Sequence, residues 1–203
     1  MTQLLNLDSS KEATAPDGRR SRSVATRKKI VSALTELVRE GVLAPTAEQV
    51  SGRANVGLRT VFRHFDDMET LYREMHQQFD TILQPALREQ LKAGTWQERL
   101  QESVVARADF YEQAMPFYIS TLVHRHESPF LNEQVAIGAG IQRDMLRHLL
   151  PHKLAQDSSR FEALLLILSI DAWLRLRREQ CLSVAAAIKT MQPAGRALSS
   201  AAS

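Results

Sequence analysis

The chain has 203 residues, of which 44% are hydrophobic and 24% charged, as is ordinary for a globular protein with a packed core. A single cysteine, Cys181, excludes an intrachain disulfide, and the longest apolar run, residues 163–168, is far too short to span a membrane. Only 8 glycines are present, which argues against Gly-rich nucleotide loops and many tight hairpins. Because the first residues are polar, we expect no signal peptide. Taken together, these features predict a cytoplasmic, mainly helical protein that does not interact with membranes.

Positive charge is concentrated at the front of the chain. Residues 1–65 contain 11 Lys and Arg against 6 Asp and Glu, whereas residues 66–203 contain 15 against 17. The stretch 19–29 has no acid and six basic residues, namely Arg19, Arg20, Arg22, Arg27, Lys28 and Lys29. Such a front end favours binding to a nucleic acid or another anionic surface; a solvated basic tail is the alternative.

The predicted elements begin with a disordered basic arm over residues 1–22. A helix follows from Ser23 to Gly41, because apolar residues recur on one of its faces. Thr46 and Gln49 have capping-box spacing and predict a short helix through residue 54. Gly57 then begins a second short helix over 58–65.

Only helical patterns follow. We expect helices over residues 67–94 (kinked at Pro85), 95–113, 116–124, 129–150, 158–180 and 183–191. The prediction is an all-α fold of about nine helices with four regions: the arm 1–22, a three-helix head over 23–66, a larger helical domain over 67–192, and a flexible tail over 193–203.

The head has the pattern of a helix-turn-helix, in which two short helices flank a tight turn and pack on a longer first helix. We expect Leu58, Val61 and Phe65 to face the core of the head. Arg59 and Arg63, one turn apart, are then left on the outer face, where an arginine can bind guanine or phosphate. The residues expected to contact phosphate are Thr46, Thr60 and His64.

Phe62 lies beside these basic residues. It is expected to contact a thymine methyl group or the sugar-phosphate chain; packing against the core of the head is the alternative.

Residues 24–72 resemble the DNA-binding head of TetR-type transcriptional regulators. The resemblance is carried by the run Thr46–Phe65, above all by Arg59-Thr60-Val61-Phe62-Arg63-His64-Phe65, with Leu71 at the right distance. Phe62 replaces the commoner tyrosine of that family, and Met68 stands where the family often has a phosphate-binding lysine. The arginines at positions 19, 20 and 22 are expected to compensate by contacting DNA.

The resemblance implies a homodimer that binds an inverted-repeat operator in double-stranded DNA and is released by an unidentified small-molecule effector. A repressor is therefore the leading prediction. The alternatives are a DNA-binding protein of the same fold without an inducer and a small helical enzyme. No catalytic motif, cofactor site or metal site is identified in the sequence.

The larger domain offers candidates for the effector pocket and the dimer interface. The pocket candidates are Phe110, Phe117, Tyr118, His124, Ile141, Met145 and Asp171. Plain core packing is the alternative for the aromatic residues and Met145, and an ion pair with Arg175 or Arg178 is the alternative for Asp171.

The dimer-interface candidates are Phe161, Leu164, Leu165, Leu168, Ala172, Ala185 and Ile188. Together they are expected to form a four-helix bundle with a second copy; packing within one subunit is the rival use of this apolar stripe.

Overall fold

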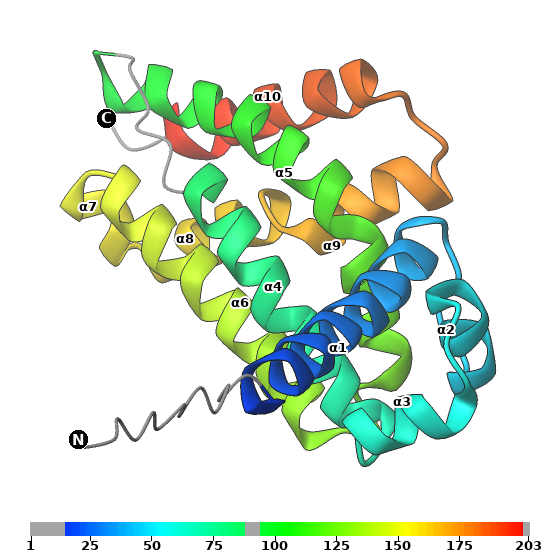
Figure 1. The fold of residues 1–203 in the computed structure, drawn as a ribbon. Coiled ribbons are helices and arrows are strands. Elements are labelled where there is room, and N and C mark those ends of the chain that lie inside the picture. Colours follow the sequence, from blue (N-terminus) through cyan, green and yellow to red (C-terminus); the bar gives the residue numbers. More distant parts are fainter. Residues whose placement is uncertain (1–14, 88–93, 201–203) are drawn as a thin grey trace, which may run out of the picture.

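A computed structural model describes residues 15–87 and 94–200. Every regular element in these ranges is helical, which confirms the all-α fold (Figure 1). The elements are α1 (Ala15–Arg39), α2 (Ala47–Ala54), α3 (Leu58–His64), α4 (Met68–Leu87), α5 (Trp96–His124), α6 (Pro129–Leu149), α7 (His152–Gln156), α8 (Ser158–Ile167), α9 (Ile170–Leu174), a π-helix (Arg175–Glu179) and α10 (Val184–Ser200). None of the helices in the described ranges has the length and apolarity needed to cross a bilayer.

The head is built from α1 to α3 and is closed by the start of α4. The apolar face of α1 is buried as its periodicity predicts, with Ile30 and Leu34 fully inaccessible to solvent. It packs against Val50 of α2 and against Val61 and Leu71, which are also buried. The head therefore has a small hydrophobic core of its own, which continues into the body through Phe117 and Leu131.

The turn between α2 and α3 has the predicted geometry. The Thr46 hydroxyl accepts a hydrogen bond from the Gln49 amide at 3.3 Å, and the Gln49 side chain accepts one from the Thr46 amide at 2.9 Å. Asn55 ends α2 in the left-handed conformation, with φ of 49°, and Gly57 precedes α3. The capping box and the turn residues are both confirmed.

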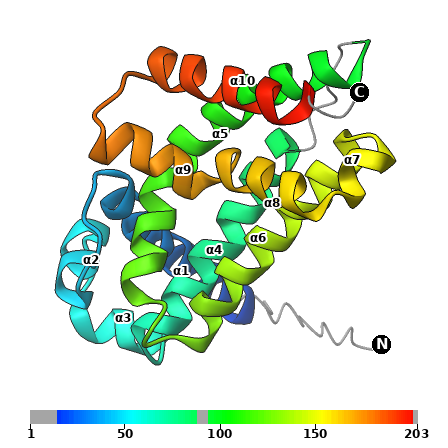
Figure 2. The same ribbon diagram turned by 180° about the vertical axis from the view of Figure 1, so that it is seen from behind.

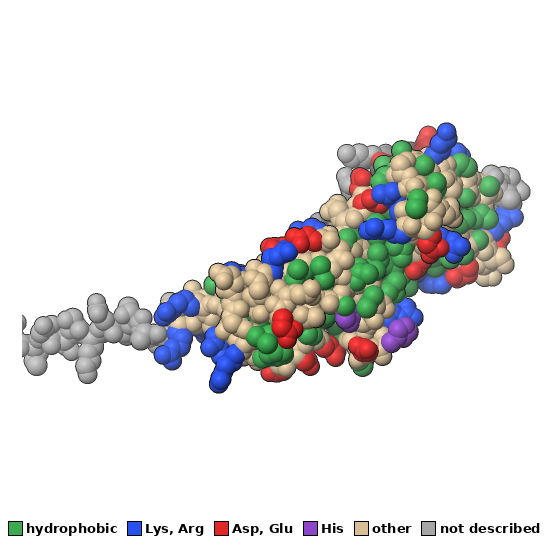
Figure 3. Space-filling model, turned by 90° about the vertical axis from the view of Figure 1, so that its right-hand side faces the viewer, with side chains coloured by type: hydrophobic (Ala, Val, Ile, Leu, Met, Phe, Trp, Pro, Cys, Tyr) green, Lys and Arg blue, Asp and Glu red, His purple; other side chains and the backbone are tan. Residues whose placement is uncertain are grey.

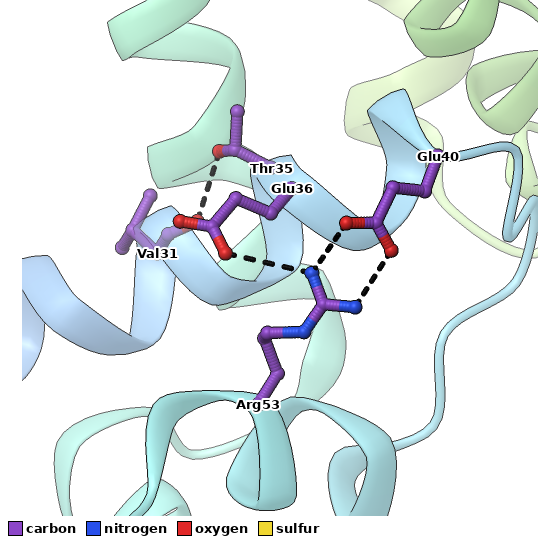
Figure 4. A network of polar contacts seen from close by, with 5 residues as sticks. All are labelled: Val31, Thr35, Glu36, Glu40 and Arg53. Carbon is purple, nitrogen blue, oxygen red and sulfur yellow. Dashed lines mark hydrogen bonds and ion pairs between the residues drawn. The ribbon is translucent and has the colours of Figure 1, made fainter.

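An arginine on α2 ties that helix to α1 (Figure 4). Arg53 donates to both carboxylate oxygens of Glu40, at 2.8 and 2.6 Å, and lies 3.5 Å from Glu36. These hydrogen bonds lower the pKa of Glu40 and raise that of Arg53. The pairing fixes the angle between the two helices from the outer side, while Val50 fixes it from the core.

The body is arranged around α5, the longest helix. α10 lies along α5 at one end of the molecule (Figure 1), and α6 packs on α5 as well. Figure 2 shows α8 and α9 following one another across the front of the molecule in that view. Their buried side chains, including Leu164 and Trp173, join Leu146 of α6 and Tyr111 of α5 in a second hydrophobic core.

Two predicted boundaries near the chain ends are wrong. α1 begins at Ala15 rather than Ser23, so residues 15–22 of the predicted arm are helical; Pro16 and Asp17 suit the first turn of a helix. α10 continues to Ser200, so residues 193–200 of the predicted tail are helical, because Met191 is buried and Leu198 packs on the body core. Residues 1–14, 88–93 and 201–203 lie outside the described part of the chain.

Two helix boundaries in the body differ from the prediction, one at a proline and one at a serine. α5 is a single helix that passes through Pro116, because buried residues on both sides, Met115 and Phe117, hold it in place. The predicted helix 158–180 is divided after Leu168, where the Ser169 hydroxyl accepts from the Ala172 amide at 3.1 Å and begins a new helix. The short helix α7 was not predicted at all.

Candidate nucleic-acid interface

The short helix α3 is anchored by two residues. Val61 is 1% exposed and Phe65 is 2% exposed, as predicted. Leu58 is 37% exposed, so the prediction that it also anchors the helix is wrong. Leu58 is the first residue of α3 and lies at the edge of the head, where the core ends.

The opposite face of α3 carries Arg59, Phe62 and Arg63, which are all exposed. Neither arginine forms an ion pair or hydrogen bond with any described residue. Phe62 is 48% exposed, so its ring is not part of the head core. The face therefore combines two unpaired cations with an accessible aromatic ring, a combination suited to a DNA groove.

His64 and Thr60 border this face and are half-buried. Burial lowers the pKa of His64 below its ordinary value, and the charges of Arg63 and Arg27 lower it further. The imidazole is accordingly neutral at pH 7, and a neutral ring still has one N–H to donate to a phosphate oxygen.

Arg27, one of the six basic residues in the stretch 19–29, holds the end of α3 in place. Its Nε donates to Glu74 at 2.6 Å, and its Nη1 donates to the backbone carbonyl of His64. The guanidinium lies 4.1 Å from the centre of the Phe65 ring. No local sequence pattern indicates this role, because Glu74 is 47 residues away along the chain.

The remaining basic residues of α1 lie on the surface. Arg19, Arg20 and Arg22 are exposed, and among the described contacts the only hydrogen bond donated by their side chains runs from Arg22 Nε to the Gly18 carbonyl, at 3.1 Å. Figure 3 shows Lys and Arg side chains gathered at the narrow end of the molecule, on the left of that view. These arginines extend from a helix rather than from the disordered arm that was predicted.

The first turn of α2 combines favourable and unfavourable features for phosphate. The Thr46 hydroxyl accepts a hydrogen bond from the Gln49 amide, and its own O–H interacts with the Glu48 carboxylate. Glu48 lies in the same turn, and hydrogen bonds to its own backbone amide and to Thr46 lower its pKa, so it is ionised at neutral pH. A phosphate that binds at this turn would therefore compete with the Glu48 carboxylate for the Thr46 hydroxyl.

The predicted pocket residues do not converge on one place. Phe117 is buried and belongs to the head core, whereas Ile141 is 40% exposed. His124 meets the Tyr72 hydroxyl at 3.0 Å, at the junction of head and body. Phe110 packs against the body core, and Met145 is half-buried.

Tyr118 and Asp171 are brought together: the Tyr118 hydroxyl donates to Asp171 at 2.7 Å. Asp171 does not form the ion pair with Arg175 or Arg178 that was the alternative to a pocket role. Arg175 instead lies 3.7 Å from Glu179, and Arg178 forms no ion pair with a described residue.

Three of the predicted dimer residues are already used within one subunit. Phe161, Leu164 and Leu168 are at most 3% exposed and lie in the body core, so the rival reading is the correct one for them. Leu165, Ala172 and Ile188 are half-buried, and Ala185 is exposed. The stripe was misassigned because an apolar helix face has the same pattern in a core and in an interface.

A scan against models of known protein families and a search of curated proteins find no match to this chain.

Proposed function

We propose that this protein is a sequence-specific DNA-binding regulator of transcription of the TetR type, acting as a repressor. The observation that supports the proposal best is the outer face of α3. Arg59 and Arg63 are exposed and unpaired there, whereas Arg27 and Arg53 in the same head are held by acids. Both arginines are therefore available to contact DNA, while the buried Val61 and Phe65 hold the helix on the head.

In the proposed complex, α3 lies in the major groove of DNA. Arg59 and Arg63 contact base edges, of which guanine O6 and N7 suit a guanidinium best. Thr60, His64 and Thr46 contact phosphates and set the register of the helix on the duplex. Phe62 packs against a thymine methyl group or the sugar-phosphate chain.

The junction between head and body gives the effector a route to the DNA-binding surface. The Ser120 hydroxyl of α5 donates to the Leu43 carbonyl in the loop before α2, at 2.7 Å. His76 of α4 lies 3.0 Å from the Thr121 hydroxyl of α5. A displacement of α5 by an effector would therefore be transmitted to α4 and to the loop that leads into α2.

The test begins with selection of bound sequences from random DNA, followed by affinity measurements on a panel of variant sites. Arg59→Ala or Arg63→Ala is expected to cost about 1–3 kcal/mol of binding free energy and to relax preference at one position of the site. The matched control is Arg178→Ala, which removes an exposed, unpaired arginine from the body. It should leave sequence preference unchanged.

Two results would contradict the proposal. One is the absence of any enriched sequence after selection with the full chain. The other is unchanged sequence preference in both the Arg59→Ala and the Arg63→Ala variants.

A further inference from the structure

A buried arginine in the body has no acid to neutralise it. Arg107 of α5 is only 6% exposed, yet it forms no ion pair with a described residue. Only its Nη1 is hydrogen-bonded, at 3.4 Å to the Tyr111 hydroxyl and at 3.4 Å to the Leu168 carbonyl. Its Nε is the one buried side-chain nitrogen or oxygen of the described residues that has no hydrogen-bond partner.

The existing contacts are too weak to explain why a charge is buried here. A buried cation is ordinarily paired with an anion and has its N–H groups satisfied. The Leu168 carbonyl already accepts a hydrogen bond of 2.6 Å from Tyr111, so it is satisfied without Arg107. Burial raises the pKa of Tyr111, and this keeps its hydroxyl protonated as the donor in that bond.

Two acids of this part of the body are engaged with other residues. Asp171 accepts the hydrogen bond from Tyr118, and its charge acts on Tyr111 without forming a pair with Arg107. Glu112, the other acid close to this part of α5, binds Arg177 and the Trp173 indole N–H. Neither carboxylate forms an ion pair with Arg107, which is left without a counter-charge among the described residues.

We propose that Arg107 binds the carboxylate of a small, otherwise apolar molecule. The Nε and Nη2 of a guanidinium lie on one edge, and that edge matches the two oxygens of a carboxylate. This is the edge that Arg107 leaves unpaired. An apolar remainder of the ligand is indicated because Tyr111, which contacts Arg107, is in ring contact with Phe110 and Trp173.

The position also explains how such a ligand would act as the effector, a step that rests on the proposed function. Arg107 shares α5 with Ser120, which contacts the loop before α2, and with Thr121, which contacts His76 of α4. It also contacts Leu168, where α8 ends and α9 begins, a break that offers a place for local adjustment. A carboxylate at Arg107 would thus act on the helix that carries the junction.

The experiment uses Trp173 as the reporter. The chain has two tryptophans, so the Trp96→Phe variant of the full protein leaves Trp173 as the only one. Benzoate and octanoate are the probes, benzamide and octanamide are their uncharged matches, and sodium chloride controls for ionic strength. At least one carboxylate should change the emission of Trp173 saturably and raise the Tm, while the amides and chloride do neither.

Variants of the arginine separate binding from a structural role. Arg107→Met should abolish the carboxylate response without lowering the Tm of the unliganded protein, because it removes an uncompensated buried charge. Arg107→Lys should weaken binding about tenfold or more, because it loses the two-pronged contact. Arg99→Gln, on the same helix, is the matched control and should respond as the parent does.

The proposal is overturned if neither carboxylate gives a response, if the amides act equally, if Arg107→Met still responds, or if that variant melts lower without ligand. Gel retardation of a selected DNA site, with and without benzoate, separates this inference from the proposed function. Absence of DNA binding without benzoate, together with an intact carboxylate response at Arg107, refutes only the regulator. Intact DNA binding with no carboxylate response refutes only the site.

Discussion

The arginines of the head fall into two groups, those that form an ion pair with an acidic residue and those that do not. Arg27 and Arg53 are paired and hold helices together, whereas Arg59 and Arg63 are unpaired and face solvent. The sequence predicted the second pair correctly because position along a short amphipathic helix determines which way a side chain points. It could not predict the role of Arg27, because that role depends on a contact between distant segments.

The role of Arg27 leads to a prediction about stability. Arg27→Ala removes the ion pair with Glu74, the hydrogen bond to the His64 carbonyl and the stacking on Phe65. We expect a loss of about 1–3 kcal/mol in the free energy of unfolding, measured in urea. Lys28→Ala, the exposed neighbour, is the control. An equal effect of the two substitutions would show that Arg27 does not hold α3.

His76 gives a prediction about pH. Burial lowers its pKa to about 4, whereas the unfolded chain has the ordinary value near 6.5. The unfolded state therefore takes up the proton first, and the stability that His76 contributes is full above about pH 6.5 and is lost as pH falls towards 4. The loss should be on the order of 2–3 kcal/mol.

The measurement is urea unfolding from pH 7 to pH 4 for the parent and for His76→Gln, whose amide can still donate to the Thr121 hydroxyl. The variant should lose less stability over this range than the parent. Identical pH dependence in the two proteins would mean that His76 titrates normally in the folded state.

Elements were predicted well wherever a local signal sets the boundary. The capping box at Thr46, the left-handed Asn55 and the Ser128–Pro129 start of α6 are all local, and all are confirmed. Errors arose where tertiary packing overrides local preference, as at Pro116 within α5 and Pro193 within α10. A proline costs a helix one hydrogen bond, and burial of the neighbouring turns outweighs that loss.

Two helices of the protein, α2 and α5, begin with a capping box, so the effects of removing each one can be compared. Thr46 begins α2 in the head, and Thr95 begins α5 in the body with a hydrogen bond of 3.2 Å from the Glu98 amide. Either threonine changed to alanine should cost about 0.5–2 kcal/mol of stability. Only Thr46→Ala should also weaken binding to DNA, and about equally for all sequences, because a phosphate contact carries no sequence information.

At the scale of the whole molecule, the sequence predicted a head and a body but not how the body uses its apolar residues. Phe161 and Leu164 belong to the body core, where they meet residues of α5 and α6. The same helix leaves Leu166 67% exposed, more than any other large hydrophobic residue described. Sequence periodicity identifies an apolar face but not the surface that covers it, so a dimer interface, if one forms, would have to use residues that remain exposed.

If the protein is a two-fold dimer, its two α3 helices should bind an inverted repeat whose half-site centres lie about 34–36 Å apart. Leu166 is the expected centre of the interface, and Leu166→Glu should yield a monomer in sedimentation and footprints of single half-sites at much higher protein concentration. Ile137→Glu, at a 45% exposed position on α6, should remain dimeric and protect both half-sites. A parent protein that is monomeric at every concentration, or that protects one asymmetric half-site throughout, would rule out the dimer while leaving the groove contacts of α3 open to the tests above.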